Sequence, residues 1–441
     1  MFWESRKLRL YSLGVIGILL ALAIIPLRGA FSNEGEPLLP ARSKATQPPS
    51  LDSPQNVPAS SRATPATPPP PTVTARGTPP TPGASPASRA GRGFLRTEGA
   101  RIVDAEGNEV RITGVNWFGM ETGTFAPHGI WARRWQDMLD MVVELGFNTV
   151  RLPYSNDIFN PNSKPNGIDF YQNPDLDGIS ALEIMDKIVE GAGKRGLRII
   201  LDRHRPDQYG QSNLWYTDKV SEERWIEDWK RLAQRYRGND TVIGADLHNE
   251  PHGGATWGDG NPKTDWRMAA EKAGNAILSA NPDWLIIVEG IDTYKGDGYW
   301  WGGNLMGVLD APVRLAVPNR LVYSAHDYGP GVYNQSWFLD PSFPNNLPGI
   351  WDSHWAYIRN QGIAPVLMGE FGGRSVGRDT EGVWQRALMK FLKERGIHYT
   401  YWSLNPNSGD TGGILLDDWK TVDRAKMAVL SEYQWPLMGR E

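Results

Sequence analysis

Two stretches of the chain place a glutamate directly after a short apolar run. Glu250 lies in Asp246-Leu247-His248-Asn249-Glu250-Pro251, after the run 242–245, and Glu370 lies in Met368-Gly369-Glu370-Phe371, after the run 365–368. Short apolar runs bounded by Gly or Pro predict buried parallel strands. Both carboxylates would then lie at the C-terminal ends of strands, which is the edge where α/β proteins carry out chemistry.

Each glutamate also has an interpretation that needs no chemistry. Asn249 could be a helix N-cap with Pro251 in the first turn, and Glu370 could lie in a turn. Those alternatives weaken because two glutamates recur at strand ends of one repeating unit. Two carboxylates that face each other across a cleft are the catalytic groups of enzymes that cleave glycosidic bonds.

The elements that would position these residues alternate along the chain from residue 94. Strand patterns occupy 112–116, 148–153, 197–203, 242–249, 284–289, 321–327, 365–370 and 398–404. Helical patterns occupy about 131–145, 179–195, 221–236, 265–280, 350–360, 379–395 and 420–431, whereas 290–320 is loop-rich and its helix is doubtful. This alternation predicts an α/β fold, a (β/α)8 TIM barrel, with a doubly wound sheet as the alternative. A short N-terminal hairpin, 95–103 with 109–112, would precede it.

The first 92 residues differ from the rest in composition. Residues 10–27 form an apolar run behind a basic start, which predicts that 1–30 is a signal peptide or a signal-anchor helix. We favour an uncleaved anchor with its basic end inside the cell. Residues 31–92 hold 15 of the 34 prolines, between Pro37 and Pro86, which predicts a Pro/Ser/Thr-rich disordered linker. The barrel domain would occupy 93–441.

Charge and cysteine content exclude several classes of function. Residues 1–92 carry 10 Lys and Arg against 4 Asp and Glu, so the net charge of −4 leaves the remainder near −10. An acidic body argues against nucleic acid or another polyanion as partner. The chain has no cysteine, which excludes disulfides, thiolate metal sites and cysteine nucleophiles. The 19 tryptophans fit a neutral sugar ligand, although about half would be core residues.

Polar and aromatic residues end nearly every predicted strand, which a barrel built for packing alone would not need. The phrases Gly-Val-Asn-Trp-Phe-Gly, Asn-Thr-Val-Arg-Leu-Pro-Tyr, Leu-Asp-Arg-His-Arg-Pro-Asp, Asp-Leu-His-Asn-Glu-Pro, Tyr-Ser-Ala-His-Asp-Tyr and Gly-Glu-Phe-Gly occur in this order. With them, the sequence from about residue 93 resembles glycoside hydrolase family 5, and within it the bacterial secreted endo-β-1,4-glucanases. The resemblance covers none of residues 1–92.

The resemblance implies a role for each matching residue. Glu250 would be the acid/base and Glu370 the nucleophile of a retaining, double-displacement hydrolysis of β-1,4-glucosidic bonds in cellulose or related β-glucans. Supporting residues would be Arg151, His204, Asn249, His326, Tyr328 and Trp402. Arg151 and Tyr328 would favour the charged form of Glu370. No cation is evident beside Glu250 in the sequence, so the negative Glu370 is expected to raise the pKa of Glu250.

Further aromatic residues lie in predicted loops at the same edge. Trp117, Trp257 and Trp301 are expected to contact substrate, while Trp215 and Trp300 could line the cleft or only fix their loops. We expect no metal and no cofactor, because the histidine and carboxylate spacings fit no metal site: Pro251 separates His248 from His252.

Other functions remain open on the same fold. A β-mannanase or another β-glucanase would use the same machinery. A catalytically dead surface protein that binds polysaccharide would not need both glutamates. The predicted partner is a β-1,4-glucan chain, with no nucleic acid, and the membrane would be touched only through the N-terminal segment if it stays uncleaved. We expect a monomer outside the cytoplasm, secreted or held at the cell membrane by the N-terminal helix.

Overall fold

The computed structural model describes residues 91–438 of the 441-residue chain. The predicted signal or anchor segment and nearly all of the predicted linker lie outside these residues. Within the described range, no helix has the length and apolar character needed to cross a membrane.

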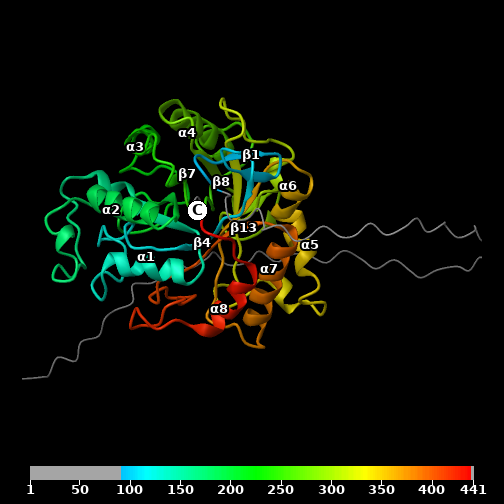
Figure 1. The fold of residues 1–441 in the computed structure, drawn as a ribbon. Helices are drawn as coiled ribbons and strands as arrows, with labels where there is room; N and C mark the ends of the chain where they lie inside the picture. Colours follow the sequence, from blue (N-terminus) through cyan, green and yellow to red (C-terminus); the bar gives the residue numbers. More distant parts are fainter. Residues whose placement is uncertain (1–90, 439–441) are drawn as a thin grey trace, which may run out of the picture. The chain divides into compact units, whose positions relative to one another are not determined.

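Eight parallel strands close into a barrel, which confirms the predicted (β/α)8 fold and excludes the doubly wound sheet (Figure 1). Neighbouring strands are joined in chain order, and the last pairs with the first. The strands are β4 (Thr113–Asn116), β5 (Thr149–Ser155), β6 (Arg198–Arg205), β7 (Val242–Asp246), β8 (Leu285–Glu289), β11 (Leu321–His326), β12 (Val366–Glu370) and β13 (His398–Tyr401).

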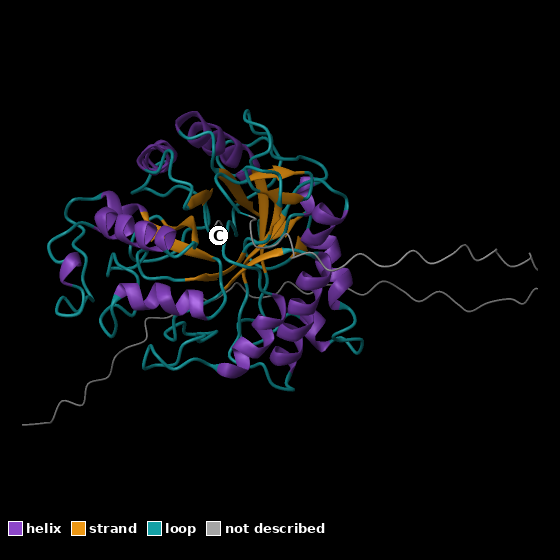
Figure 2. Ribbon diagram, in the orientation of Figure 1, coloured by secondary structure: helices purple, strands orange, loops and turns teal. Residues whose placement is uncertain are grey.

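Helices surround the strands on the outside of the barrel, as Figure 2 shows. They are α1 (Trp135–Glu144), α2 (Ala181–Lys194), α3 (Glu222–Arg235), α4 (Trp266–Ala280), α5 (Leu347–Trp351), α6 (Tyr357–Asn360), α7 (Thr380–Arg395) and α8 (Arg424–Leu430). Side-chain N-caps start several of them, since Ser180, Ser221, Asp265 and Asp379 each accept a hydrogen bond from the first turn.

The connection after β8 contains no α-helix, as expected from its loop-rich sequence. It carries a two-stranded ribbon, β9 (Thr293–Tyr294) with β10 (Asp297–Gly298), and a short 3-10 turn, η4 (Met306–Val308). The helix expected at 350–360 begins earlier and is divided, because a π-helical turn, η6 (Asp352–Ala356), separates α5 from α6.

Helix α3 shows how the helical layer positions the catalytic edge. Its buried face presents Trp225 and Trp229, which are four residues apart and therefore lie on the same side of the helix. Both indole N–H groups donate to the carbonyl of Leu247, at 3.0 and 3.1 Å. Leu247 comes just after β7, so two buried tryptophans fix the segment that leads to Glu250.

A small N-terminal sheet closes the other end of the barrel. The expected hairpin is instead three strands, β1 (Arg96–Glu98), β2 (Arg101–Val103) and β3 (Glu109–Val110). The prediction of one strand over 95–103 is wrong because Gly99, with a φ of 57°, begins a tight turn between β1 and β2. Apolar side chains of this sheet form one buried cluster with the barrel residues Ile200, Ile243, Leu285, Ile287, Val322 and Leu367.

Candidate active site

The two glutamates meet at the C-terminal edge of the barrel. Glu370 is the last residue of β12, and Glu250 lies four residues beyond the end of β7. One carboxylate oxygen of each, together with a ring nitrogen of His326, lie within 4.8 Å of one another. The structure therefore brings together the two carboxylates that the sequence singled out.

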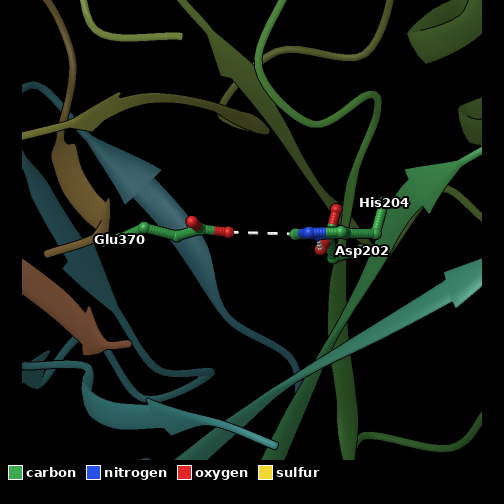
Figure 3. Close-up of side chains that lie close together, drawn as sticks. All are labelled: Asp202, His204 and Glu370. Atoms are coloured by element: carbon green, nitrogen blue, oxygen red, sulfur yellow. Dashed lines mark hydrogen bonds and ion pairs between the residues drawn. The ribbon is translucent and has the colours of Figure 1, made fainter. Parts of the chain in front are cut away.

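Glu370 is held by a cation and a hydroxyl. The Arg151 guanidinium lies 2.5 Å from Oε1, and the Tyr328 hydroxyl donates to Oε2 at 2.7 Å. His204 Nδ1 lies 3.9 Å from Oε1, as drawn in Figure 3, and His326 Nδ1 lies 3.7 Å from Oε2. Burial and the charge of Glu370 raise the pKa of Tyr328 well above its usual value, so its hydroxyl stays a donor.

Arg151 is the centre of this network and is completely buried. Burial lowers its pKa, but the surrounding carboxylates raise it well above the usual value, so the charge is permanent. Besides Glu370, the guanidinium contacts oxygens of Asp202 (3.1 Å), Asp246 (2.9 Å), Glu289 (3.2 Å), Asn116 (3.0 Å) and Asn249 (3.0 Å). Arg151 is thus no ordinary salt-bridge residue, because it ties five strands or strand ends to one cation.

The surroundings of Glu250 differ from the expectation. His326 Nδ1 lies 3.0 Å from Oε1, and the Gln211 amide donates to Oε2 at 3.3 Å. Burial would raise the pKa of Glu250, but the hydrogen bond and charge of His326 lower it below the usual value. The expectations that no cation lies beside Glu250, and that its pKa is raised, are therefore wrong, because a histidine from β11 reaches it.

His326 faces a carboxylate on each side of its ring. Its Nε2 lies 3.3 Å from Glu289 Oε1, an ion-pair contact without the alignment of a hydrogen bond. Burial lowers the pKa of His326, but the charges of Glu289 and Glu370 and the hydrogen bond to Glu250 raise it well above the usual value. A ring between two acceptors favours the doubly protonated form.

His204 and Asn249 lie buried beside Arg151 and the two glutamates. His204 lies beside Asp202 (Figure 3), with His204 Nδ1 2.6 Å from Asp202 Oδ2. Burial lowers the pKa of His204 to about 4. The side-chain oxygen of Asn249 accepts from Arg151, while its Nδ2 is buried and has no hydrogen-bond partner among the described residues. His248 is structural, since it is buried and its Nδ1 lies 2.8 Å from Arg203 Nη1.

The predicted aromatic residues fall into two groups. Trp402 is half-buried and stacks on His204, with ring centroids 5.3 Å apart, and Trp301 is 42% exposed and stacks on His252 at 3.7 Å. Trp117 and Trp257 are buried, and their indoles donate to the carbonyls of His128 and Ala311 at 2.8 Å. The prediction that these two contact substrate does not fit the structure, because their rings are enclosed by protein.

Sequence reasoning gave no role to four residues that shape the site. Gln211 contacts Glu250, Glu289 contacts both Glu250 and Arg151, and Asp202 and Asp246 contact Arg151. Glu289 and Asp246 are the last residues of β8 and β7, and Asp202 lies three residues before the end of β6, so all three were visible in the sequence as acidic residues of strands. Gln211 lies in a loop and left no such signal.

Asp327 also stands behind the site. Its carboxylate accepts hydrogen bonds from the indoles of Trp351, at 2.9 Å, and Trp384, at 2.8 Å, and from the Tyr299 hydroxyl. The backbone N–H of Asp327 donates to the Glu370 carbonyl at 3.1 Å. This buried anchor fixes the residue that precedes Tyr328, and so helps to aim the Tyr328 hydroxyl at Glu370.

Two groups of side chains have a spacing that could suit a metal ion. They are Asp202, His204 and Glu370, and Glu250, His326 and Glu370. Arg151 already lies at two of these carboxylates, and His326 carries a raised pKa. A cation would have to displace a permanent charge or a proton, so the donor set fits carboxylate chemistry better than a metal.

Comparison with known proteins agrees with this geometry. A model of the cellulase family, glycosyl hydrolase family 5, matches residues 103–408. The chain is 58% identical over 352 residues to an endoglucanase of Paenibacillus polymyxa, covering 79% of this chain and 89% of that protein. It is 46% identical over 336 residues to the major extracellular endoglucanase of Xanthomonas campestris pv. campestris, covering 75% and 69%.

Solved structures show the same likeness. A hyperthermophilic endocellulase of the archaeon Pyrococcus horikoshii matches with a TM-score of 0.73 and 44% identity, over 77% of this chain and 98% of that chain. A complex of the Pyrococcus endocellulase with cellotetraose matches with a TM-score of 0.73 and 42% identity, over 79% and 99%.

Proposed function

Because the chain belongs to glycosyl hydrolase family 5, the cellulase family, we propose that it hydrolyses internal β-1,4 linkages of cellulose or related β-glucans with retention of configuration. The observation that carries the proposal is the closeness of Glu250 and Glu370, whose nearest oxygens lie within 4.8 Å. Retaining enzymes hold their carboxyls about 5–5.5 Å apart, whereas inverting enzymes leave room for a water between them.

In the first step Glu370 attacks the anomeric carbon and the glycosidic bond breaks. Arg151 and Tyr328 contact the two oxygens of Glu370 and hold the carboxylate in place until the bond to the sugar forms. The leaving oxygen takes a proton from Glu250. Glu250 and His326 share one proton across their 3.0 Å contact, so the proton passes from the imidazolium to the carboxylate and on to the leaving group.

In the second step Glu250 acts as a base. Glycosylation removes the negative charge of Glu370, so the Glu250–His326 pair can take a proton from water. The resulting hydroxide attacks the same carbon from the face opposite Glu370, and the sugar leaves with its original configuration. No other group is needed for the cycle, because each proton that leaves the pair returns to it.

Other side chains are placed to hold the reacting sugar. Nδ2 of Asn249, which has no hydrogen-bond partner within residues 91–438, can donate to a sugar hydroxyl, and the Arg151 contact fixes its orientation. Trp402 has part of its ring exposed and stands beside His204 and Phe118, with both ring pairs nearly parallel. A flat indole of this kind can stack under a pyranose and help to hold it in a distorted shape.

The substrate is tested by comparing carboxymethylcellulose, mixed-linkage β-glucan and galactomannan. We expect reducing ends to appear with a rapid fall in viscosity on carboxymethylcellulose, because internal cuts shorten chains quickly. Proton NMR of a cellooligosaccharide digest should show the β-anomer first. Release of sugar from galactomannan alone would make the protein a mannanase, and no release from any of the three would leave a binding protein.

We further propose that the protein acts outside the cytoplasm as a monomer, with 1–30 as its export signal or anchor. The extracellular relative from Xanthomonas supports this location. Cell fractionation with N-terminal sequencing tests it: intact chain in the membrane fraction indicates an anchor, and mature chain in the medium indicates cleavage. Cytoplasmic enzyme would contradict the proposal.

A separately folding catalytic domain is the matching proposal for 93–441. The chain used for the test begins at Gly91, because the Gly91 N–H donates to Asp104 at 2.8 Å and its carbonyl accepts from Arg198 at 2.5 Å. A chain that begins at Gly91 should be soluble, active and monomeric by size-exclusion chromatography. Loss of activity in this shortened chain, with the full chain active, would show that the boundary is misplaced.

A further inference from the structure

Glu289 is a buried carboxylate that the proposed cycle does not use. It is the last residue of β8, and no part of its surface is exposed. Its own carbonyl accepts the Trp266 indole N–H at 2.8 Å, which fixes the end of the strand. A buried charge of this kind is costly unless its contacts compensate it, so its contacts indicate what it is for.

Those contacts converge on the acid/base. Glu289 Oε2 accepts the backbone N–H of Glu250 at 2.7 Å. Its Oε1 lies 3.3 Å from His326 Nε2 and 3.2 Å from the Arg151 guanidinium. One carboxylate therefore touches the backbone of Glu250, the histidine that shares a proton with Glu250, and the cation that binds Glu370.

The backbone of Glu250 needs such an anchor. Its φ is 52°, in the left-handed region, which costs a non-glycine residue about 1–2 kcal/mol. The hydrogen bond to Glu289 holds the peptide in that orientation. Gly302 closes over the pair, since a Cβ at that position would lie 2.4 Å from Glu289 Oε2 and 3.2 Å from Glu250 Cα. The contact leaves no room for a side chain.

We propose that Glu289 is a positioning residue for the acid/base. Glu289 anchors the Glu250 backbone and orients His326, while Arg151 keeps Glu289 aligned with the nucleophile. This inference rests on the proposed function and adds a role that acts through Glu250 and His326. Burial and the charge of Asp246 raise the pKa of Glu289 to about 8, so its charge depends on the facing groups His326 and Arg151.

The test compares two buried carboxylates that differ in what they touch. Asp246 is as buried as Glu289, and it binds the same guanidinium at 2.9 Å. In the part of the chain that the structure describes, no hydrogen bond or ion pair joins Asp246 to Glu250 or His326. Asp246→Asn is therefore a matched control for Glu289→Gln, since each variant replaces one carboxylate beside Arg151 by an amide of the same shape.

The readout is kcat/KM on two cellobiosides. Phenyl cellobioside needs a proton on its leaving oxygen, whereas 2,4-dinitrophenyl cellobioside does not. For Glu289→Gln we expect a loss of about 10–100-fold on the phenyl donor, because proton transfer contributes that much or more, and a loss below about threefold on the dinitrophenyl donor. Asp246→Asn should lose the same factor on both donors.

A second readout is the alkaline limb of kcat/KM on the phenyl donor. The negative charge of Glu289 helps to raise the pKa of His326, so Glu289→Gln should move that limb to lower pH. A third is a double-mutant cycle on the phenyl donor: once Glu250→Ala has removed the acid/base, Glu289→Gln should cost little further there.

Equal loss on both donors in Glu289→Gln, or the same donor dependence in Asp246→Asn, would overturn the inference. If Glu289→Gln does not fold by circular dichroism, Trp266→Phe replaces it, because that change removes the N–H bound to the Glu289 carbonyl, together with the rest of the five-membered ring, and leaves the Glu289 carboxylate in place. Its smaller loss should again be confined to the phenyl donor. A wild type inactive on both donors would instead contradict the proposed function, so the two failures are distinguishable.

Discussion

Glu370 and Glu250 lie within 4.8 Å of each other, yet the protein holds them by different chemistry. Glu370 faces Arg151, which cannot lose its proton, and the Tyr328 hydroxyl. Glu250 faces His326, whose proton can move. A nucleophile needs a charge that persists, whereas an acid/base needs a proton that is exchanged twice in each cycle. The comparison shows that the partner, more than the carboxylate, sets the role.

The backbones at Glu370 and Glu250 are also held in different ways. Glu370 belongs to a strand and pairs with His326 in the parallel ladder between β11 and β12. Glu250 lies beyond its strand in a left-handed conformation, and its N–H is held by one side chain, that of Glu289. The nucleophile is therefore fixed by the sheet, and the acid/base by a hydrogen bond that a single substitution can remove.

Removal of each carboxylate should give the largest difference. Glu370→Ala should lower activity on every substrate by about 10^5-fold or more, because no covalent intermediate can form. Glu250→Ala should lose about 10^2–10^4-fold on phenyl cellobioside but little in kcat/KM on the dinitrophenyl donor. Both variants should keep the wild-type circular dichroism spectrum.

Azide and a fluorinated inhibitor check the assignment independently. Azide should accelerate Glu250→Ala and give the β-glycosyl azide, since the intermediate is α-linked and azide enters from the opposite face. With Glu370→Ala, azide should give the α-azide. A 2-fluoro-cellobioside should label Glu370 in the wild type. A label on Glu250 by peptide mass spectrometry, or β-azide from the Glu370 variant, would reverse the roles.

Loss of the permanent cation should be the next largest effect, on stability as well as on rate. Arg151→Met leaves four buried carboxylates without their cation, so the free energy of unfolding should fall by about 3–5 kcal/mol. Burial already raises the pKa of Asp202 and of Asp246 to about 6, above their usual values. The deficit should therefore be smallest in acid, where these carboxyls are protonated, and grow as the pH rises through that range.

Urea unfolding of wild type and Arg151→Met at several pH values measures this. Tyr328→Phe is the control, because it removes the other ligand of Glu370 without leaving a buried charge unpaired, and it should lower kcat with little change in the unfolding midpoint. A deficit in Arg151→Met that shrinks as the pH rises would contradict the assigned network.

His326, the titratable partner of Glu250, should affect the pH profile of kcat/KM. In the wild type the Glu250–His326 pair loses its proton only as the pH passes the raised pKa of His326. In His326→Asn the proton rests on Glu250 alone, so the alkaline limb of kcat/KM should move to lower pH by about one unit or more. Tyr328→Phe should leave that limb in place. An unchanged limb in His326→Asn would show that the pair does not share its proton.

The sequence could predict the barrel and both glutamates for a physical reason. Strand periodicity places Glu250 and Glu370 at one edge, and the closed barrel then forces Arg151 and Tyr328 to the same place. It could not predict which residue each carboxylate would meet. His326 was identified at a strand end, but its reach to Glu250 depends on the register and on the left-handed turn at Glu250, so the predicted pKa direction was wrong.

Trp117 and Trp257, which were predicted to contact substrate, show that the sequence also did not indicate which way a side chain points. Successive residues of a strand point to opposite sides. Asn116 faces the barrel interior, where it accepts from Arg151 at 3.0 Å, so the next residue, Trp117, turns toward the outer layer. The strand-end position therefore places Asn116 in the active site but does not place Trp117 there. Trp257 was a loop prediction, and loops carry no such alternation to decide burial.

Each glutamate also has an aromatic ring stacked on a nearby histidine, and smaller effects should separate the two. Trp402 stacks on His204 beside Glu370, and Trp301 stacks on His252, whose Nδ1 lies 2.6 Å from the Glu250 carbonyl. Trp402→Ala should lower kcat at least about 10-fold, or 1.4 kcal/mol, with the fold retained by circular dichroism. Trp301→Ala, the exposed counterpart, should change KM more than kcat. Near-normal turnover in Trp402→Ala would place that ring outside the reacting site.

The smallest expected effect is that of removing divalent ions, and it tests whether both glutamates act only through protons and charge. Side chains with a type and spacing that could suit a metal lie around the nucleophile, in the group of Asp202, His204 and Glu370, and around the acid/base, in the group of Glu250, His326 and Glu370. On the nucleophile side, Arg151 lies 3.1 Å from Asp202 and 2.5 Å from Glu370, so an ion there would meet a fixed positive charge. On the acid/base side, an ion would have to displace the proton that His326 holds with a raised pKa.

Dialysis against EDTA should therefore leave the rate within experimental error. Added Zn2+ should only inhibit, and more strongly as the pH rises and His326 loses its proton. Activity lost on dialysis and restored by one divalent ion would show that the carboxylates work through a metal, and the contrast between a permanent and an exchangeable partner would no longer explain their roles.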